Sequence, residues 1–223
     1  FGFENVRIKY SDRPEKRVGS DEIWDKSEKA LKIAVEATGL SFTHNPGEGA
    51  FYGPKLEFIL RDAIGRDWQC GTHQIDVNLP KRLKATYIGE DGQKHTPVLL
   101  HRAMFGSLER FFGGLVEHYG GAFPVWLAPI QAVVIPIADR HLEYAEAIKS
   151  ELKGFGVRTD SDVRNERMNA KIRDAQLQKV PFILVVGDRE VESHMVSVRL
   201  RNGQDMGAMS TSAISAHIQD EAK

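Results

Sequence analysis

The sequence contains a single cysteine, Cys70, among 223 residues. An internal disulfide is therefore excluded, and so is a metal site built from several cysteines of this chain. A lone cysteine is compatible with a reducing compartment, and we expect a cytoplasmic protein. An excess of charge of one sign is also lacking, because 30 basic residues stand against 31 acidic ones and the formal net charge is −1. No uniform electrostatic field therefore attracts nucleic acid or membranes.

Long apolar runs are missing as well. No stretch reaches the roughly 18 apolar residues that a membrane-spanning helix needs, and we see no signal-peptide pattern. The sequence is 41% hydrophobic and 27% charged, which is typical of a globular chain and excludes a fibrous repeat. The chain does not start with Met, and Phe1 leads directly into strand-like sequence. We therefore expect it to begin inside a longer protein.

The N-terminal half alternates strand-like and helical patterns. Strands are predicted over residues 3–10, 55–60 and 68–79, and a helix between Ser20 and Gly39. The Asp91-Gly92 turn predicts a hairpin that pairs residues 83–88 with 97–100. A helix with a wide apolar stripe is predicted over residues 103–119.

The pattern changes after a Gly- and Pro-containing linker at residues 120–129. Strands are predicted over residues 132–137, 157–160, 182–186 and 196–200, and helices over residues 141–153, 165–179 and 212–219. This alternation indicates a small, mostly parallel α/β unit. We expect two domains, residues 1–123 and 124–223.

Three segments of the first domain could carry chemistry. The first is the glycine-rich loop 47–53, which delivers Lys55 to a strand and could meet an anion. Considered alone, an ordinary turn followed by a solvated lysine is the better interpretation. The second is residues 68–74, where Gln74 could share a face with Thr72, or with Gln69 if a bulge intervenes at Gly71. A small polar ligand and hydrogen bonding within the sheet explain these polar groups equally well.

The third segment is residues 101–110, in which Ser107 and Arg110 share a helical face. A guanidinium can stack on a purine and also bind phosphate. The alternative is a structural His101 followed by solvated charges.

In the second domain, Arg164, Arg167 and Lys171 fall on one helical stripe, and five basic residues stand against two acidic ones over residues 164–179. This patch could bind RNA, although a solvated face is the usual outcome of such a pattern.

Together and in order, residues 47–55, 69–74 and 101–110 resemble the C-terminal half of the catalytic domain of class II aminoacyl-tRNA synthetases, in the form of the bacterial-type threonyl-tRNA synthetases. Residues from Pro124 onward resemble the anticodon-binding domain shared with the glycyl, prolyl and histidyl enzymes. The fold that this resemblance implies is α/β and α+β. It comprises an antiparallel-sheet catalytic part, with the third signature motif of the class, and a small α/β domain with a mixed five-stranded sheet.

The resemblance also implies roles for individual residues. The implied catalytic residues are Arg110, Lys55 and Gln69. The implied ATP and adenylate residues are Arg110, Gln69, Thr72 and Ser107. The implied pocket for threonine and the tRNA 3′ end comprises Tyr52, Lys55 and Gln74. His101 is implied as one of three ligands of Zn²⁺. The implied anticodon-binding residues are Asn165, Arg173, Glu190 and Arg199.

The implied activity is that of a threonine–tRNA ligase. Threonine reacts with ATP and Mg²⁺ to give threonyl-adenylate, and the threonyl group then passes to tRNA(Thr). The first two signature motifs and the other two zinc ligands are expected before Phe1, so we expect the isolated chain to be inactive. The full protein is expected to be a homodimer, and a second chain could carry the rest of the catalytic domain. The alternative is a non-catalytic RNA-binding or regulatory module derived from a synthetase.

Overall fold

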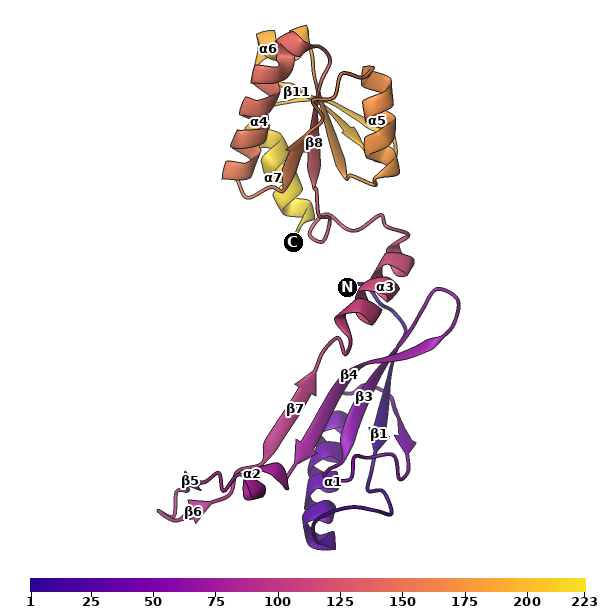
Figure 1. Cartoon of the computed structure of the whole chain (residues 1–223), viewed down its shortest axis with the longest axis vertical. Helices are drawn as coiled ribbons and strands as arrows, with labels where there is room; N and C mark the ends of the chain where they lie inside the picture. The colour runs from indigo at the N-terminus through magenta and orange to yellow at the C-terminus, as the bar shows by residue number, and fades with distance from the viewer. The chain divides into compact units, whose positions relative to one another are not determined.

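The computed structural model describes all 223 residues, which form two compact units, Phe1–His118 and Tyr119–Lys223. Each unit is built around one five-stranded sheet, and Figure 1 labels most of the elements. The domain boundary between residues 123 and 124 stays a prediction.

The sheet of the first unit has the strand order β2-β1-β3-β4-β7. Its strands are β1 (Val6–Ser11), β2 (Phe42–Asn45), β3 (Lys55–Arg61), β4 (Asp67–Asp76) and β7 (Leu99–Ala103). All neighbouring strands are antiparallel except β1 and β2, which are parallel. The antiparallel sheet predicted for this part is thereby confirmed, with one parallel pair added at its edge.

Helix α1 (Asp21–Glu36) covers one face of this sheet. It begins at residue 21 because the Ser20 side chain accepts a hydrogen bond from the backbone N–H of Ile23 and so caps the first turn. Alternate residues of the strands, such as Ile8 and Leu56, pack against Leu31 of the helix. The residues between these apolar ones on each strand are mostly polar, and their side chains lie on the opposite face of the sheet.

Three predictions in this unit were wrong. The hairpin pairs β5 (Tyr87–Ile88) with β6 (Lys94–His95), whereas residues 97–100 lead into β7, which pairs with β4 instead. Strand β4 stops before residue 79, where the short helix α2 (Leu79–Arg82) begins with a proline in its first turn. Helix α3 (Leu108–Tyr119) starts five residues later than predicted, because Ala103 belongs to β7 and residues 104–107 form bends, with Gly106 at a positive φ of 65°.

The sheet of the second unit has the strand order β12-β11-β10-β8-β9. Its strands are β8 (Ala132–Pro136), β9 (Thr159–Ser161), β10 (Phe182–Val186), β11 (Val196–Leu200) and β12 (Asp205–Met209). Strands β9, β8 and β10 are parallel, and β11 and β12 are antiparallel to their neighbours. The mixed five-stranded sheet implied by the resemblance is therefore confirmed.

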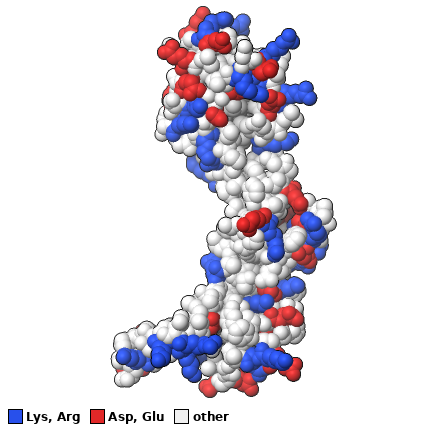
Figure 2. Space-filling model, viewed as in Figure 1, with Lys and Arg blue, Asp and Glu red and all other residues white.

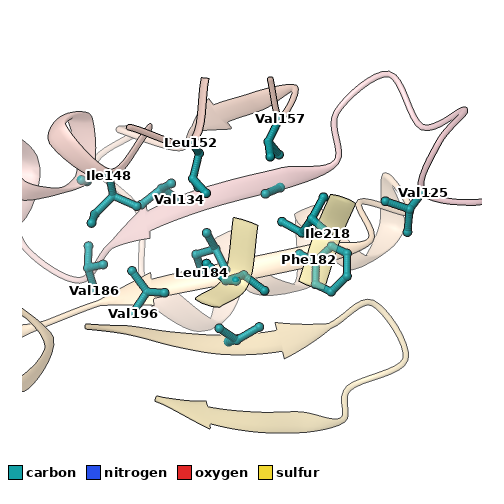
Figure 3. Packing of buried hydrophobic residues seen from close by; sticks show 14 residues of the cluster. Val125, Val134, Ile148, Leu152, Val157, Phe182, Leu184, Val186, Val196 and Ile218 are labelled. Carbon is teal, nitrogen blue, oxygen red and sulfur yellow. The ribbon is translucent and has the colours of Figure 1, made fainter. Parts of the chain in front are cut away.

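Helices cover both faces of this second sheet. They are η1 (Asp139–His141), α4 (Leu142–Gly154), α5 (Met168–Leu177), α6 (Asp188–Ser193) and α7 (Thr211–Glu221). Figure 3 shows Leu152 of α4 and Ile218 of α7 meeting Val134 and Leu184 on one face. Helix α5 packs Ile172 on the other face. Because β8 and β10 are buried on both faces, their sequences are continuously apolar rather than alternating.

No helix in either unit combines the length and the apolar character needed to cross a membrane.

Candidate functional sites

A row of polar residues crosses the sheet of the first unit, on the face turned away from α1. The strand register places Lys55 of β3 opposite Gln74 of β4, and Gln74 opposite His101 of β7. Adjacent strands lie about 4.8 Å apart, so the three backbones lie within about 10 Å of one another. Residues predicted from three separate segments are thus brought together on one surface.

Lys55 is the cation of this row, and it is not a solvated side chain. Its Nζ lies 2.8 Å from Oε1 of Glu57, and the Lys55 side chain is only 21% exposed. Oε2 of Glu57 accepts a hydrogen bond of 3.0 Å from the Ser11 hydroxyl, so both oxygens of this buried carboxylate have partners. The interpretation favoured for Lys55 alone, a solvated lysine after a turn, was therefore wrong. The pair fixes an ammonium group at the surface of the sheet.

A bulge in β4 determines which face Gln69 occupies. The register of β3 and β4 shifts after Phe58, so that Phe58 pairs with Gly71 and the next residue pairs with Gln69. Cys70 is the extra residue that has no partner on β3. Gln69 therefore lies on the same face as Thr72 and Gln74. The sequence left open whether Gln74 shares a face with Thr72 or, through a bulge, with Gln69, and in the structure it shares a face with both.

Hydrogen bonds between side chains order this polar face. Nε2 of Gln69 donates to Oγ1 of Thr72 at 2.9 Å, and the Tyr52 hydroxyl donates to Oε1 of Gln74 at 2.8 Å. Tyr52 also lies edge-on to His101, with ring centroids 5.9 Å apart. These groups satisfy one another in part and keep free donors and acceptors, as a surface for a small polar ligand requires.

His101 is held by a buried carboxylate. Its Nε2 lies 3.0 Å from Oδ2 of Asp76, which is 4% exposed. Burial alone would raise the pKa of Asp76, but hydrogen bonds from the backbone N–H of Leu79 and from His101 lower that pKa below its usual value. An ionised Asp76 fixes the proton of His101 on Nε2 and leaves the lone pair of Nδ1 for another partner.

These residues do not form a zinc site by themselves. No group of three or more His, Cys, Asp or Glu side chains in the structure could hold a metal ion. A catalytic zinc ion needs three protein ligands and one open position, and His101 supplies a single imidazole. The donor set of this chain therefore fits a metal only if further ligands come from outside it.

Arg110 lies in the first turn of α3, beside Trp68 of β4. The central carbon of its guanidinium is 5.0 Å from the centroid of the Trp68 ring, and no carboxylate lies within ion-pair distance. Its backbone N–H donates to the Ser107 hydroxyl at 3.3 Å, and this hydroxyl donates to Glu109 at 2.7 Å. Arg110 is thus oriented by an aromatic face, and its N–H groups stay available for an anion.

The largest cavity of the first unit lies on the other side of the sheet. It measures 490 Å³ and is lined mainly by apolar side chains, among them Leu56 and Phe58, with Thr72 as the only predicted site residue at its edge. Cys70 also borders it, and burial raises the pKa of the Cys70 thiol. A thiolate is therefore disfavoured there, and the structure offers no activated cysteine nucleophile.

Three residues that support this site were not predicted from the sequence. Glu57 forms an ion pair with Lys55, Asp76 forms a hydrogen bond with His101, and the Trp68 ring forms a cation–π contact with Arg110. Strand alternation could have revealed the two carboxylates, because Lys55 and Glu57, like Gln74 and Asp76, are two residues apart and share a face. No sequence signal links Trp68 with Arg110, which come together only through folding.

In the second unit, two predicted RNA-binding residues present free polar groups. Asn165 lies in the exposed segment between β9 and α5, and its side-chain amide makes no hydrogen bond within the chain. Arg173 is exposed on α5 and has neither a carboxylate nor a hydrogen-bond partner. Both groups are available to a ligand on the α5 side of the sheet.

The other two predicted residues lie on α6 and β11. Oε2 of Glu190 accepts the backbone N–H of Gly187 at 2.9 Å at the start of α6. Arg199 pairs in register with Ile183, on the face that α5 covers, and its buried Nε–H has no partner.

The predicted basic stripe on α5 was wrong. Helix α5 starts at Met168, so Arg164 and Arg167 precede it. Arg164 is engaged by Asp162 and Asp174, and Lys171 is buried. Figure 2 accordingly shows Lys and Arg side chains interspersed with Asp and Glu over the visible face of this unit.

The chain belongs to the class II aminoacyl-tRNA synthetases. The family described as the tRNA synthetase class II core domain (G, H, P, S and T) matches residues 3–119, and the family described as the anticodon binding domain matches residues 131–221. Within the class, its sequence is similar to threonine–tRNA ligases. It is 58% identical over 222 residues to that of Treponema pallidum (strain Nichols) and 55% identical over 221 residues to that of Saccharophagus degradans. The resemblance predicted from the sequence is confirmed.

Solved structures agree with these sequence matches. The RNA binding domain of threonyl-tRNA synthetase from Cryptosporidium parvum superimposes with a TM-score of 0.89 at 35% identity, over 97% of this chain and 55% of that one. A threonyl-tRNA synthetase from Aeropyrum pernix superimposes with a TM-score of 0.75 at 28% identity, over 100% of this chain and 55% of that one. The two bacterial ligases are matched over 98% and 99% of this chain, which spans only 37% and 35% of their lengths.

Proposed function

We propose that this chain forms part of the catalytic site and the anticodon-binding domain of a threonine–tRNA ligase. The observation that carries the proposal is the convergence of Lys55, Gln74 and His101 in one row of the sheet, in a chain 54–58% identical to threonine–tRNA ligases. The substrates would be threonine, ATP with Mg²⁺, and tRNA(Thr). The protein would act in the cytoplasm.

The first step would join the threonine carboxylate to the α-phosphorus of ATP and release pyrophosphate. Because the carboxylate is already ionised, the step needs alignment and charge neutralisation rather than a strong base. Arg110, stacked on Trp68 with free N–H groups, would bind the adenine and the triphosphate. Gln69, Thr72 and Ser107 would bind the nucleotide through their hydroxyl and amide groups.

The row at Lys55 would bind the amino acid and the 3′ end of the tRNA. Tyr52 and Gln74 offer a hydroxyl and an amide there, and the Lys55 ammonium offers positive charge. His101 would be one ligand of Zn²⁺, oriented by Asp76, with the other ligands outside this chain. When bound, such an ion would supply a Lewis acid for the amino and hydroxyl groups of threonine. A site that demands the hydroxyl rejects valine strongly.

The second unit would recognise the anticodon. Asn165, Arg173, Glu190 and Arg199 would contact its bases through amide, guanidinium and carboxylate groups. The unpartnered N–H of Arg199 supports this role, because a buried donor without a partner costs free energy unless a ligand satisfies it. A homodimer, and a second chain that carries the rest of the catalytic domain, remain implications of the resemblance.

Threonine-dependent exchange of pyrophosphate into ATP tests this proposal. The assay uses a chimaera in which this chain replaces the matching segment of the Treponema pallidum ligase. We expect exchange by the chimaera and none by the isolated chain, which supplies one zinc ligand. A folded chimaera without exchange would contradict the catalytic role and favour a non-catalytic RNA-binding module.

A further inference from the structure

Lys171 is a buried cation beneath the loop that carries Asn165. It is 4% exposed, and no carboxylate lies within ion-pair distance of its ammonium. Its Nζ donates to the backbone oxygen of Asp162 at 3.1 Å and to that of Pro136 at 3.4 Å. The ammonium therefore bonds to main chain rather than to a charged partner.

These two oxygens belong to different segments. Pro136 is the last residue of β8, and Asp162 directly follows β9, the parallel neighbour of β8. Lys171 thus ties the carboxyl ends of two strands to α5. The segment held in this way is the loop of residues 162–167, in which Asn165 is exposed.

A second, exposed tie holds the same loop. Nη2 of Arg164 lies 2.7 Å from Oδ2 of Asp162 and 2.8 Å from Oδ2 of Asp174 on α5. A cavity of 50 Å³ lies where Lys171, Pro136 and Asn165 meet. This volume has room for water but not for a base, so an RNA base would meet the loop and not the ammonium.

A buried ammonium is costly for stability. Desolvating the charge costs several kcal/mol, and an apolar side chain of the same length would avoid that cost. The ammonium offers in exchange three donors that fix the positions of main-chain oxygens.

We propose that Lys171 is a positioning residue for RNA recognition. It holds the loop of residues 162–167 so that the Asn165 amide faces an unpaired base, and it does not contact the RNA. This inference rests on the anticodon recognition proposed for the second unit.

Binding of RNA hairpins to this 223-residue chain tests the inference. The probes are the threonine anticodon stem-loop and the same stem-loop with its three anticodon bases replaced. For Lys171→Met we expect about tenfold weaker binding of the first hairpin, unchanged binding of the second, and an unchanged dependence of log K on log salt. Lys153→Met, an exposed lysine on α4, is the matched control and should bind like wild type.

A double-mutant cycle connects Lys171 with Asn165. If Lys171 acts through Asn165, the effects of Lys171→Met and Asn165→Ala on binding are not additive. Arg164→Ala removes the exposed tie and leaves the core intact, so it should also weaken cognate binding, even where Lys171→Met does not fold.

The outcomes separate the two proposals. Wild-type affinity in Lys171→Met or in Arg164→Ala overturns the positioning role alone. A salt slope reduced by about one in Lys171→Met means that the ammonium contacts phosphate, and this also overturns it. A wild-type chain that binds both hairpins equally overturns anticodon recognition and the inference with it.

Discussion

The guanidinium of Arg110 lies over the indole ring of Trp68, 5.0 Å from its centroid. The two residues are 42 positions apart, on α3 and β4. Trp68 also donates from Nε1 to Asp62 at 2.9 Å, which fixes the plane of the ring. The orientation of a proposed ATP-binding arginine therefore depends on an aromatic platform.

Substitutions at this pair should separate charge from orientation. In the chimaera, Arg110→Ala should slow pyrophosphate exchange about 100-fold or more, because a charge-stabilising donor is lost. Trp68→Ala should raise the KM for ATP about two- to fivefold, since an exposed cation–π contact contributes about 0.5–1 kcal/mol. Trp68→Phe keeps a ring but loses the bond to Asp62, so it should lie between wild type and Trp68→Ala. Equal KM values for ATP in wild type, Trp68→Ala and Trp68→Phe would show that the Trp68 ring has no role.

The pair formed by Lys55 and Glu57 allows stability to be separated from activity. Lys55→Met leaves a buried carboxylate without its cation, and urea unfolding of the isolated chain should show a loss of about 3 kcal/mol in the first unit. Adding Glu57→Gln removes the unpaired charge and should restore most of that loss. Exchange by the chimaera should stay low in the double variant, because the ammonium is still missing. Full recovery of exchange would mean that Lys55 is only structural.

The core of the second unit should be sensitive to truncation. Leu184→Ala removes a fully buried side chain between α4 and α7 and should lower the free energy of unfolding by about 2–5 kcal/mol. Leu177→Ala makes the same change at the exposed end of α5 and should cost less than about 0.5 kcal/mol. Urea titration of both variants checks this contrast. Similar losses would mean that Leu177 is covered in solution.

Asp188 should make this unit more stable at neutral than at acid pH. A bidentate hydrogen bond from Arg140, and then one from His141, lower the pKa of Asp188 well below its usual value of 3.8. A carboxyl whose pKa is lower in the folded state stabilises the fold above the unfolded-state pKa, and this contribution is lost as the pH falls through the folded-state pKa. The stability difference between wild type and Asp188→Asn should therefore be constant at pH 5–6 and shrink below pH 4. A difference as large at pH 2 as at pH 6 would contradict the assignment.

Much of the fold could be predicted from local pattern. The buried strands at residues 182–186 and 196–200 were located to the residue, because continuous or alternating apolar runs bounded by turn residues define them. The start of α3 was misplaced, because the helical spacing of apolar residues also extends over residues 103–107, where Ala103 still pairs with β4 and Gly106 has a positive φ of 65° that ends any helical turn. Strand β12 has little apolar periodicity and forms because β11 offers it a hydrogen-bonding edge.

The residues of the candidate site could be predicted from the sequence, but the residues that hold them in place could not. The resemblance to class II synthetases implied Lys55, Gln74 and His101 as site residues, and the register of the sheet places them in one row. The pairing of His101 with Asp76 and the burial of Lys171 depend on the three-dimensional packing of separate segments. A lysine in a helical stripe looks solvated in sequence, and only the fold reveals that two backbone oxygens surround it.

The bulge at Cys70 has a consequence for changes in chain length. Because Cys70 is the residue without a partner on β3, deleting it would leave an unbroken ladder with every other pairing intact, and Gln69 would still face the same way as Thr72. A deletion between Thr72 and Gln74 would instead turn the residues on one side of it to the apolar face. Strand β4 can therefore shorten by one residue at a single point, and everywhere else its length is fixed by the alternation that keeps its polar side chains on one face and its apolar side chains on the other.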